Sequence, residues 1–342
     1  MKLSSILVIS VARIGDTVLL SPCLKAIKAQ YPAAKLTVLA HPKRMEVLEN
    51  LPVIDHLGGI TKHSAAWRGW LPGRAYDVVL VYGRDAALVR YALRVAKTVV
   101  CFDEPEFADI STGRAVKVRP PSMAIHAVAH RMMLTQPISI VVPADSRLSV
   151  ALTQRELAWI DAFIEGKSIG GHHPLIGLQL FSFPAKAHRD WPLENFSAFV
   201  RRIREAFPNA MFVILGDRLA AQRAEALVEE FPEAVSVVAG QLSLRQSMAL
   251  MSRLDLYVGV DTGPTHIAGA LGIPMVAMYH WKYPANNLRP LQNEWCTAIE
   301  HPATANPGGE FVTGMEAITV DQVVDAAMTL LRSAVERSWL CV

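Results

Sequence analysis

The chain has few cysteines, and they are widely separated. Its 342 residues include four cysteines, 7% aromatic residues and 19% charged residues. No two cysteines stand at the C-x-x-C spacing of a zinc or redox site, and their positions argue against a disulfide framework. Cys23 and Cys101 lie in apolar segments, where a small buried thiol is the ordinary role. We therefore expect a protein of a reducing cytoplasm.

Long hydrophobic runs are also missing, although the mean hydropathy is +0.25. The apolar segments, such as residues 6–12 and 76–82, are about 7 residues long, whereas a membrane-spanning helix needs about 20. The apolar segment after Lys2 is short and continues directly into Arg13-Ile14-Gly15-Asp16, unlike a signal peptide. We expect neither a transmembrane helix nor export. With 51% hydrophobic residues, the composition is that of a globular protein.

Neither sign of charge is in large excess, since the net charge is +3, but the charges are unevenly distributed. Residues 1–165 carry a balance of +6 and residues 166–342 a balance of −3. The basic residues between positions 60 and 100 are Lys62, Arg68, Arg74, Arg84, Arg90, Arg94 and Lys97. This asymmetry indicates an anionic partner for the first half, although a solvated basic surface would give the same pattern. No nucleic-acid-binding motif accompanies these residues, so we expect no nucleic-acid partner.

Short apolar segments alternate with helical patterns along both halves of the chain. Near-continuous apolar strands of this kind indicate parallel sheets that are covered on both faces. The glycine-rich stretch EGKSIGGHHP, residues 165–174, separates the two halves. We predict an α/β protein of two Rossmann-like domains, 1–165 and 166–342, facing each other across a cleft. A last helix, about 320–338, is a candidate for packing back toward the first domain. The clearest strands and helices are expected at 6–12, 17–30, 35–40, 76–82, 98–102, 153–165, 174–180, 193–207, 211–216, 219–231, 254–260 and 274–279.

The most specific segment is VDTGPTHIAGALGIP, residues 260–274, which follows a predicted strand. In open α/β sheets, ligands bind beyond the carboxyl ends of the strands. Asp261 and Thr262 can cap a helix there, and Gly263 allows the backbone to approach a ligand closely. The first N–H groups of that helix and its dipole favour an anion, and His266 can face the same ligand. Alternatively, Asp261 and Thr262 only cap the helix and His266 is a core histidine.

A second segment, RIGDTVLLSPCLKAIK at residues 13–28, follows the first predicted strand. Gly15 supplies a turn residue, but a turn does not need the carboxylate of Asp16, so this aspartate is a candidate for chemistry. The alternative is that Asp16 caps the helix predicted at 17–30. A nicotinamide-dependent oxidoreductase should show G-x-G-x-x-G at this turn, and the sequence ARIGDT does not match.

Together with HRDWPLENF at residues 188–196, these segments resemble the ADP-heptose:lipopolysaccharide heptosyltransferases of glycosyltransferase family 9. The resemblance covers nearly the whole chain, with the motifs in order. It implies GT-B architecture and an inverting transfer of heptose from ADP-heptose to the inner core of lipopolysaccharide, at the cytoplasmic face of the inner membrane. The first domain would then bind the acceptor and the second the nucleotide sugar. Another core position, another nucleotide sugar, or a non-catalytic protein that binds nucleotide sugars are the alternatives.

The resemblance also implies roles for individual residues. Asp16 matches the proposed general base of the family. A basic residue two positions before Trp-Pro matches Arg189, where many relatives carry lysine, and Lys186 is the neighbouring candidate. The ADP-sugar would be held by Lys186, Arg189, Asp261, Thr262, Gly263 and His266. No DxD-type motif stands at a suitable turn, so we expect no metal site and no obligatory cofactor besides the donor.

The basic first half then has a partner, because the lipopolysaccharide core carries carboxylates and phosphates. We expect Arg13, Lys62 and Arg68 to bind this acceptor. The segment TKHSAAWRGWLPGR, residues 61–74, also carries Trp67 and Trp70, a combination that suits peripheral contact with a bilayer. Alternatively, the two tryptophans only pack a loop against the domain.

Overall fold

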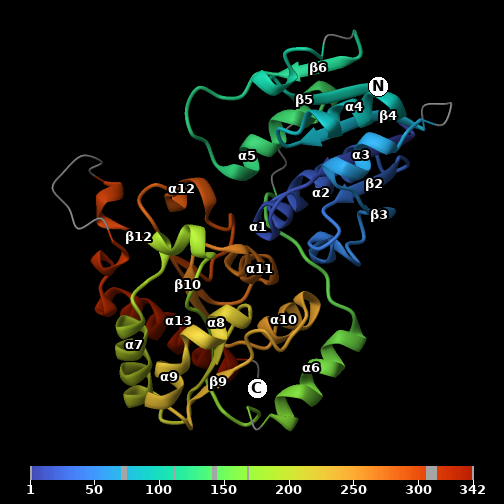
Figure 1. Ribbon diagram of the computed structural model, residues 1–342. Helices are drawn as coiled ribbons and strands as arrows, with labels where there is room; N and C mark the ends of the chain where they lie inside the picture. The colour runs from blue at the N-terminus through green and yellow to red at the C-terminus, as the bar shows by residue number, and fades with distance from the viewer. Residues whose placement is uncertain are drawn as a thin grey trace. The chain divides into compact units, whose positions relative to one another are not determined.

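The structure of the protein is a computed structural model that describes residues 2–70, 75–110, 113–140, 145–167, 169–305 and 314–340, with side chains described up to residue 333. The chain divides into two compact units, Met1–Ala151 and Leu152–Val342 (Figure 1). The predicted boundary at residue 165 thus lies one helix too late along the chain.

The helix between the two boundaries, α6 (Gln154–Gly166), packs on the second unit. Arg245 donates two hydrogen bonds of 2.7 Å to the carboxylate of Glu156, and Arg253 pairs with Asp161 at 2.6 Å. Because both arginines belong to the second unit, the helix is tied to that unit by ion pairs that the sequence pattern does not reveal.

The first unit is built on a six-stranded sheet of order β3-β2-β1-β4-β5-β6, in which every pair of neighbours is parallel. The predicted strands at 35–40 and 76–82 coincide with β2 and β4. The strands are β1 (Ser5–Ser10), β2 (Lys35–Ala40), β3 (His56–Gly59), β4 (Tyr76–Tyr82), β5 (Ala96–Phe102) and β6 (Ala115–Val118). The helices are α1 (Ile14–Val18), α2 (Ser21–Gln30), α3 (Lys62–Trp67), α4 (Ala86–Val95) and α5 (Ala127–Met132), with 3₁₀ turns η1 (Met45–Leu48), η2 (Pro105–Phe107) and η3 (Met133–Ile138).

The helix predicted at 17–30 is two helices, α1 and α2. Pro22 has no N–H to donate to the carbonyl of Val18, and the hydroxyl of Ser21 donates to that carbonyl instead, at 2.8 Å. Gly15 is a helical residue inside α1 and not a turn residue before a helix. The break leaves Asp16 on a helix of its own, directly after β1.

The second unit repeats the plan with a parallel sheet of order β12-β11-β10-β7-β8-β9. Its strands are β7 (Leu175–Gln179), β8 (Met211–Ile214), β9 (Val235–Val237), β10 (Leu256–Val260), β11 (Met275–Tyr279) and β12 (Cys296–Glu300). Besides α6, its helices are α7 (Leu193–Ala206), α8 (Arg218–Arg223), α9 (Glu225–Glu230), α10 (Leu244–Met251), α11 (Gly263–Leu271), α12 (Ala285–Leu288) and α13 (Val320–Leu340). Its 3₁₀ turns are η4 (Pro184–Arg189), η5 (Pro302–Thr304) and η6 (Met315–Ala317).

The described part of α13 packs into the core of the second unit. Its residues Val323, Ala327 and Leu331 share one buried cluster with α7 and the inner strands, and α13 runs beside α7 in Figure 1. The described part of this helix therefore belongs to the core of the second unit.

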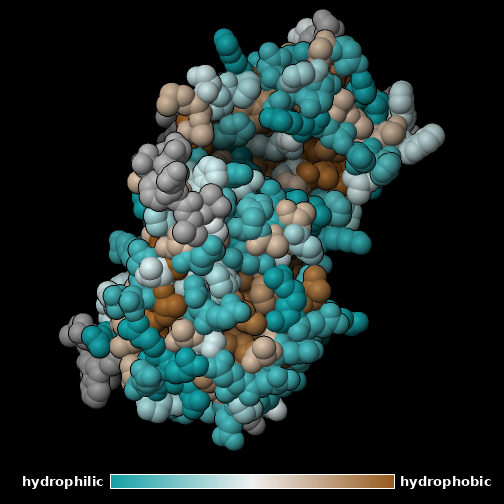
Figure 2. Space-filling view, turned by 60° about the vertical axis from the view of Figure 1, so that its left-hand side comes forward, coloured by the Kyte–Doolittle hydropathy of each residue, from teal (hydrophilic) through white to brown (hydrophobic). Residues whose placement is uncertain are grey.

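Both units bury their inner strands on both faces, as their continuous apolar composition predicts. Cys23 and Cys101 are buried free thiols, which confirms their predicted role. Hydrophilic residues cover most of the face in Figure 2, and apolar residues form separate patches there. Within the described residues, no helix combines the length and the hydrophobicity that crossing a bilayer requires.

Candidate active site

The donor residues predicted from the sequence gather at one edge of the second sheet. The strands β11, β10 and β7 are direct neighbours, so the loops that follow them meet at the same carboxyl edge. Lys186 and Arg189 lie in η4 after β7, and Asp261 follows β10. The loops after β7 and β10 therefore contribute to one cluster.

Arg189 and Asp261 form a buried ion pair at the centre of this cluster. Arg189 Nη1 lies 3.0 Å from Asp261 Oδ2, and the two side chains are 14% and 5% exposed. His266 Nε2 lies 3.5 Å from the other carboxylate oxygen. Asp261 is not the N-cap residue of α11, and its carboxylate joins a cation from one loop to a histidine on that helix.

Helix α11 begins as the motif predicts. Thr262 is its N-cap, Gly263 its first residue, and Thr262 N donates to Thr265 Oγ1 at 3.3 Å. Gly269 faces Pro290 so closely that a Cβ there would lie 2.3 Å from the proline ring, which explains a small residue on this helix. The first-turn N–H groups of such a helix favour an anion.

The loop that carries Arg189 is held by the next two residues of the HRDWP motif. Asp190 Oδ1 accepts hydrogen bonds from Ser182 N at 2.7 Å and from Ser182 Oγ at 2.6 Å. Trp191 is fully buried, and its Nε1 donates to the carbonyl of Ile318 at 2.8 Å. The motif thus positions Arg189 through the hydrogen bonds that Asp190 accepts within the loop and through the buried indole of Trp191.

Tyr283, in the loop after β11, was not predicted as a site residue. Lys186 Nζ donates to its hydroxyl at 3.0 Å, and the guanidinium carbon of Arg189 lies 3.6 Å from the centre of its ring. The hydrogen bond from Lys186 and the neighbouring Arg189 lower the pKa of Tyr283. Three adjacent strand ends therefore supply one cationic, partly buried site.

His280 lies beside this site and gives it a pH dependence. The side chain is 4% exposed, and burial, followed by the neighbours His188, His301 and Arg189, lowers its pKa from 6.5 to about 4. The imidazole of His280 therefore becomes protonated at a higher pH in the unfolded chain than in the folded chain. Folding stability from neutral His280 is therefore fully present above about pH 6.5 and lost as the pH falls toward 4.

We expect the free energy of unfolding of the second unit to fall by up to about 3 kcal/mol between pH 6.5 and pH 4 because of this group. Denaturant titrations at several pH values measure the effect, with His280→Asn as the comparison, since asparagine can still accept the hydrogen bond from Lys282 N. The same pH dependence in both proteins would contradict the assignment.

In the first unit, Asp16 forms an ion pair that was also not predicted. Arg131 Nη2, on α5, donates to Asp16 Oδ1 at 2.7 Å. The side chain of Asp16 is 47% exposed, whereas that of Arg131 is 16% exposed. Asp16 does not cap a helix: Arg13 is the N-cap residue of α1, and Asp16 lies in its first turn. The carboxylate is thus solvent-accessible and oriented by a largely buried arginine.

The three predicted acceptor residues lie at two places in the first unit: Arg13 precedes α1, whereas Lys62 and Arg68 lie at the two ends of α3. Arg13 is exposed beside Asp16, and Lys62 is exposed at the start of α3, at the carboxyl end of β3. Arg68 also serves the fold, because its Nη1 donates to the carbonyl of Gly59 at 2.7 Å. Arg74 lies outside the described residues.

Trp67 is the last residue of α3, and Trp70 lies three residues further along the chain, beside Arg94. Trp67 is 85% and Trp70 70% exposed. Arg94 lies 4.5 Å from the Trp70 ring centre and donates to the carbonyl of Arg68 at 3.0 Å. Because Arg94 directly precedes the amino end of β5, this contact lies on the side of the sheet opposite Asp16. Trp70 Nε1 also donates to the carbonyl of Ala66 at 3.0 Å, so the Trp70 ring helps to hold the loop after α3 against α4, which agrees with the alternative that the tryptophans pack a loop against the domain.

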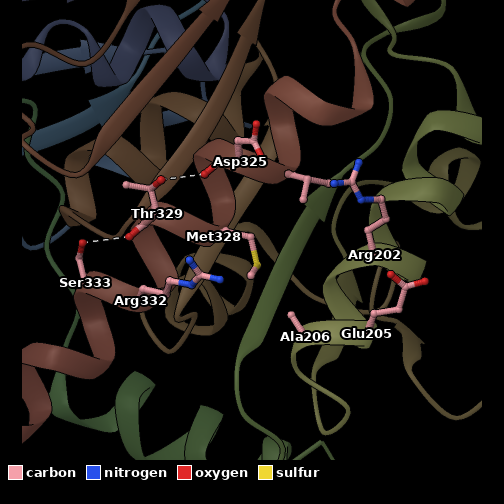
Figure 3. A pocket seen from close by; sticks show the side chains of 9 residues that line it. Arg202, Glu205, Ala206, Asp325, Met328, Thr329, Arg332 and Ser333 are labelled. Atoms are coloured by element: carbon pink, nitrogen blue, oxygen red, sulfur yellow. Dashed lines mark hydrogen bonds between the residues drawn. The ribbon is translucent and has the colours of Figure 1, made fainter.

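A groove of about 730 Å³ lies elsewhere in the second unit, between α7 and α13 (Figure 3). Its hydroxyl groups are used within α13, since Thr329 donates to the carbonyl of Asp325 and Ser333 to that of Thr329. None of the predicted site residues lines this groove. It is lined by Arg202, Glu205, Ala206, Val324, Asp325, Met328, Thr329, Arg332 and Ser333. Among the described residues, no three His, Cys, Asp or Glu side chains are grouped as metal ligands.

Known proteins resemble this chain in sequence and in fold. The sequence is 22% identical over 291 residues to the lipopolysaccharide core heptosyltransferase of Haemophilus influenzae, covering 82% of this chain and 80% of that protein. A family 9 glycosyltransferase from Veillonella parvula superposes with a TM-score of 0.82 at 20% identity, covering 97% of this chain and 99% of that one. The Escherichia coli heptosyltransferase WaaC with ADP-2-deoxy-2-fluoro heptose gives 0.67 at 15% identity, over 95% and 99% of the two chains.

The two-domain α/β fold is thus that of the GT-B heptosyltransferases, as expected. The model of glycosyltransferase family 9 (heptosyltransferase) matches residues 70–301, more than half of the chain. The chain therefore belongs to glycosyltransferase family 9, the heptosyltransferases, and is a glycosyltransferase.

Proposed function

We propose that this protein transfers heptose from ADP-heptose to the inner core of lipopolysaccharide, with inversion at the anomeric carbon. The observation that carries the proposal is the cationic cluster at one strand edge, in which Lys186 and Arg189 lie beside the start of α11. Two cations and a helix N-terminus suit a diphosphate, the leaving group of a nucleotide sugar. The WaaC structure with an ADP-heptose analogue supports the choice of donor.

In the proposed reaction, an acceptor hydroxyl attacks the anomeric carbon while the bond from that carbon to ADP breaks. Asp16 takes the proton of the attacking hydroxyl, and its exposure and its pairing with Arg131 suit a base that must meet a substrate in a fixed orientation. Lys186 and Arg189 stabilise the charge that develops on the departing ADP. The proposal needs no bound metal for this step.

For the acceptor, we assign Arg13, Lys62 and Arg68 to the carboxylates and phosphates of the core. We place the reaction at the cytoplasmic face of the inner membrane, where exposed Trp67 and Trp70 beside basic residues would contact anionic lipid. We assign the two indoles to the bilayer and not to the reacting sugar, because both are largely exposed.

We expect the double replacement Trp67→Ala and Trp70→Ala to reduce binding to anionic lipid vesicles by about tenfold, because two large amphipathic side chains are lost from the interface. Co-sedimentation with vesicles of phosphatidylglycerol and phosphatidylethanolamine measures it. Trp159→Ala is a matched control, since Trp159 is also exposed but lies on α6. Equal loss in the control, or none in the double variant, would contradict the assignment.

A donor screen tests the proposed function as a whole. Purified protein is given ADP-heptose, other ADP-sugars and UDP-sugars, each with and without a heptose-free lipopolysaccharide precursor, and released nucleoside diphosphate is measured. We expect release from ADP-heptose that depends on the acceptor. Turnover of a different nucleotide sugar alone, or binding of donors without turnover, would favour one of the alternatives raised by the sequence.

A further inference from the structure

Tyr283 contacts both cations of the cluster, although it comes from a different loop. It follows β11, whereas Lys186 and Arg189 lie in η4 after β7. Its hydroxyl accepts from Lys186 Nζ at 3.0 Å, and its ring lies under the guanidinium of Arg189 at 3.6 Å. A single phenol therefore contacts both positive charges.

Arg189 is restrained on two sides by this arrangement. Its Nη1 edge is fixed by Asp261 at 3.0 Å, and one face of its plane is covered by Tyr283. Its Nε is buried and has no hydrogen-bond partner within the described part of the chain. A planar guanidinium that is held at one edge and one face is already in one rotamer. It can therefore donate its remaining N–H groups to a ligand with little loss of conformational entropy.

The contact also offsets the repulsion between two neighbouring cations. The electron-rich ring face attracts the guanidinium, and the phenol oxygen accepts from the ammonium group. The lowered pKa of Tyr283 agrees with both cations stabilising a partial negative charge on that oxygen. Among the described residues, the hydroxyl of Tyr283 is the only hydrogen-bond partner of Lys186 Nζ, so without the phenol nothing in this part of the chain keeps the flexible lysine side chain beside Arg189.

We propose that Tyr283 is a positioning residue that pre-organises Lys186 and Arg189 for a diphosphate. The proposal rests on the proposed function, in which these two cations bind the diphosphate of the donor. Tyr283 itself makes no bond to the reacting carbon in this account. It acts through the two cations, so its effect on binding should depend on their presence.

Calorimetric titration with ADP tests this dependence. We expect Tyr283→Leu to weaken ADP binding about tenfold and Tyr283→Phe about threefold, because phenylalanine keeps the ring under Arg189 but loses the oxygen for Lys186. In the background of Lys186→Gln and Arg189→Gln, the further change Tyr283→Leu should cost less than about twofold. Tyr91→Phe is the control, a tyrosine in the first unit whose ring lies 6.0 Å from Arg94.

An equal loss with and without the two cations would show a merely structural role and overturn the proposal, as would unchanged affinity in Tyr283→Leu. A second measurement needs no ligand: the tyrosinate absorbance of Tyr283, identified by comparison with Tyr283→Phe, should titrate at higher pH in Lys186→Met. An unshifted titration would overturn the contact itself. If the unaltered protein binds no ADP but the titration shifts as expected, the proposed function fails while the cation contact stands.

Discussion

Replacing Asp16 by asparagine is expected to slow heptosyl transfer by a factor of about 10² to 10⁴ and to leave the affinity for ADP unchanged. Asparagine has the same shape and can still accept the hydrogen bond from Arg131, but it cannot take the proton of an attacking hydroxyl. Because the side chain is 47% exposed, the replacement should cost little folding stability. Turnover with ADP-heptose and the lipopolysaccharide precursor, and ADP calorimetry on the same samples, measure the two effects.

Asp109→Asn is a matched control for this variant. Asp109 is also an exposed carboxylate of the first unit in an ion pair with an arginine, Arg90, at 2.6 Å. It should transfer heptose at the rate of the unaltered protein. Full turnover by Asp16→Asn would remove the base assignment, and an equal loss in both variants would indicate a general effect of lost surface charge.

The second large effect is expected for Arg189→Ala, which should weaken ADP binding by about 10²-fold or more. The variant removes a cation from the diphosphate site, and charge-assisted bonds from arginine to phosphate are among the stronger polar contacts. It also leaves the carboxylate of Asp261, which is 5% exposed, without its arginine. Loss of one partner of a buried ion pair costs about 3 to 5 kcal/mol, so the variant should also be less stable.

A second replacement separates these two consequences. In Arg189→Ala with Asp261→Asn the buried charge is gone, so stability should recover while ADP affinity stays low. Arg253→Ala is the control, because Arg253 pairs with Asp161 and precedes β10, at the opposite edge of the sheet. Unchanged ADP affinity in Arg189→Ala would contradict this role of Arg189 and would assign binding of the diphosphate to Lys186.

The inner strands could be predicted from the sequence, whereas the edge strands β3, β6 and β12 could not. Strands such as β2 and β4 are buried along nearly their whole length, so their composition is continuously apolar. The unpredicted strands β3, β6 and β12 are at sheet edges and mostly half-buried. A short edge strand with mixed composition, such as HLGG, has no periodic signal to distinguish it from a loop.

The residues of the candidate site likewise include some that could be predicted from the sequence and some that could not. Asp16, Arg189, Asp261 and His266 could be named because each stands in a motif at a strand end. Arg131 and Tyr283 could not, because their partners are 115 and 97 residues away along the chain. Only the sheet order, which brings the loops after β7, β10 and β11 together, places Tyr283 beside Lys186 and Arg189.

The most direct test of the account is the anomeric configuration of the new glycosidic bond. Nuclear magnetic resonance of the product formed from ADP-heptose of defined configuration reports it from the coupling and shift of the anomeric proton. A single displacement with Asp16 as the base predicts the configuration opposite to that of the donor. A product with the configuration of the donor would contradict the account, because retention requires a different mechanism.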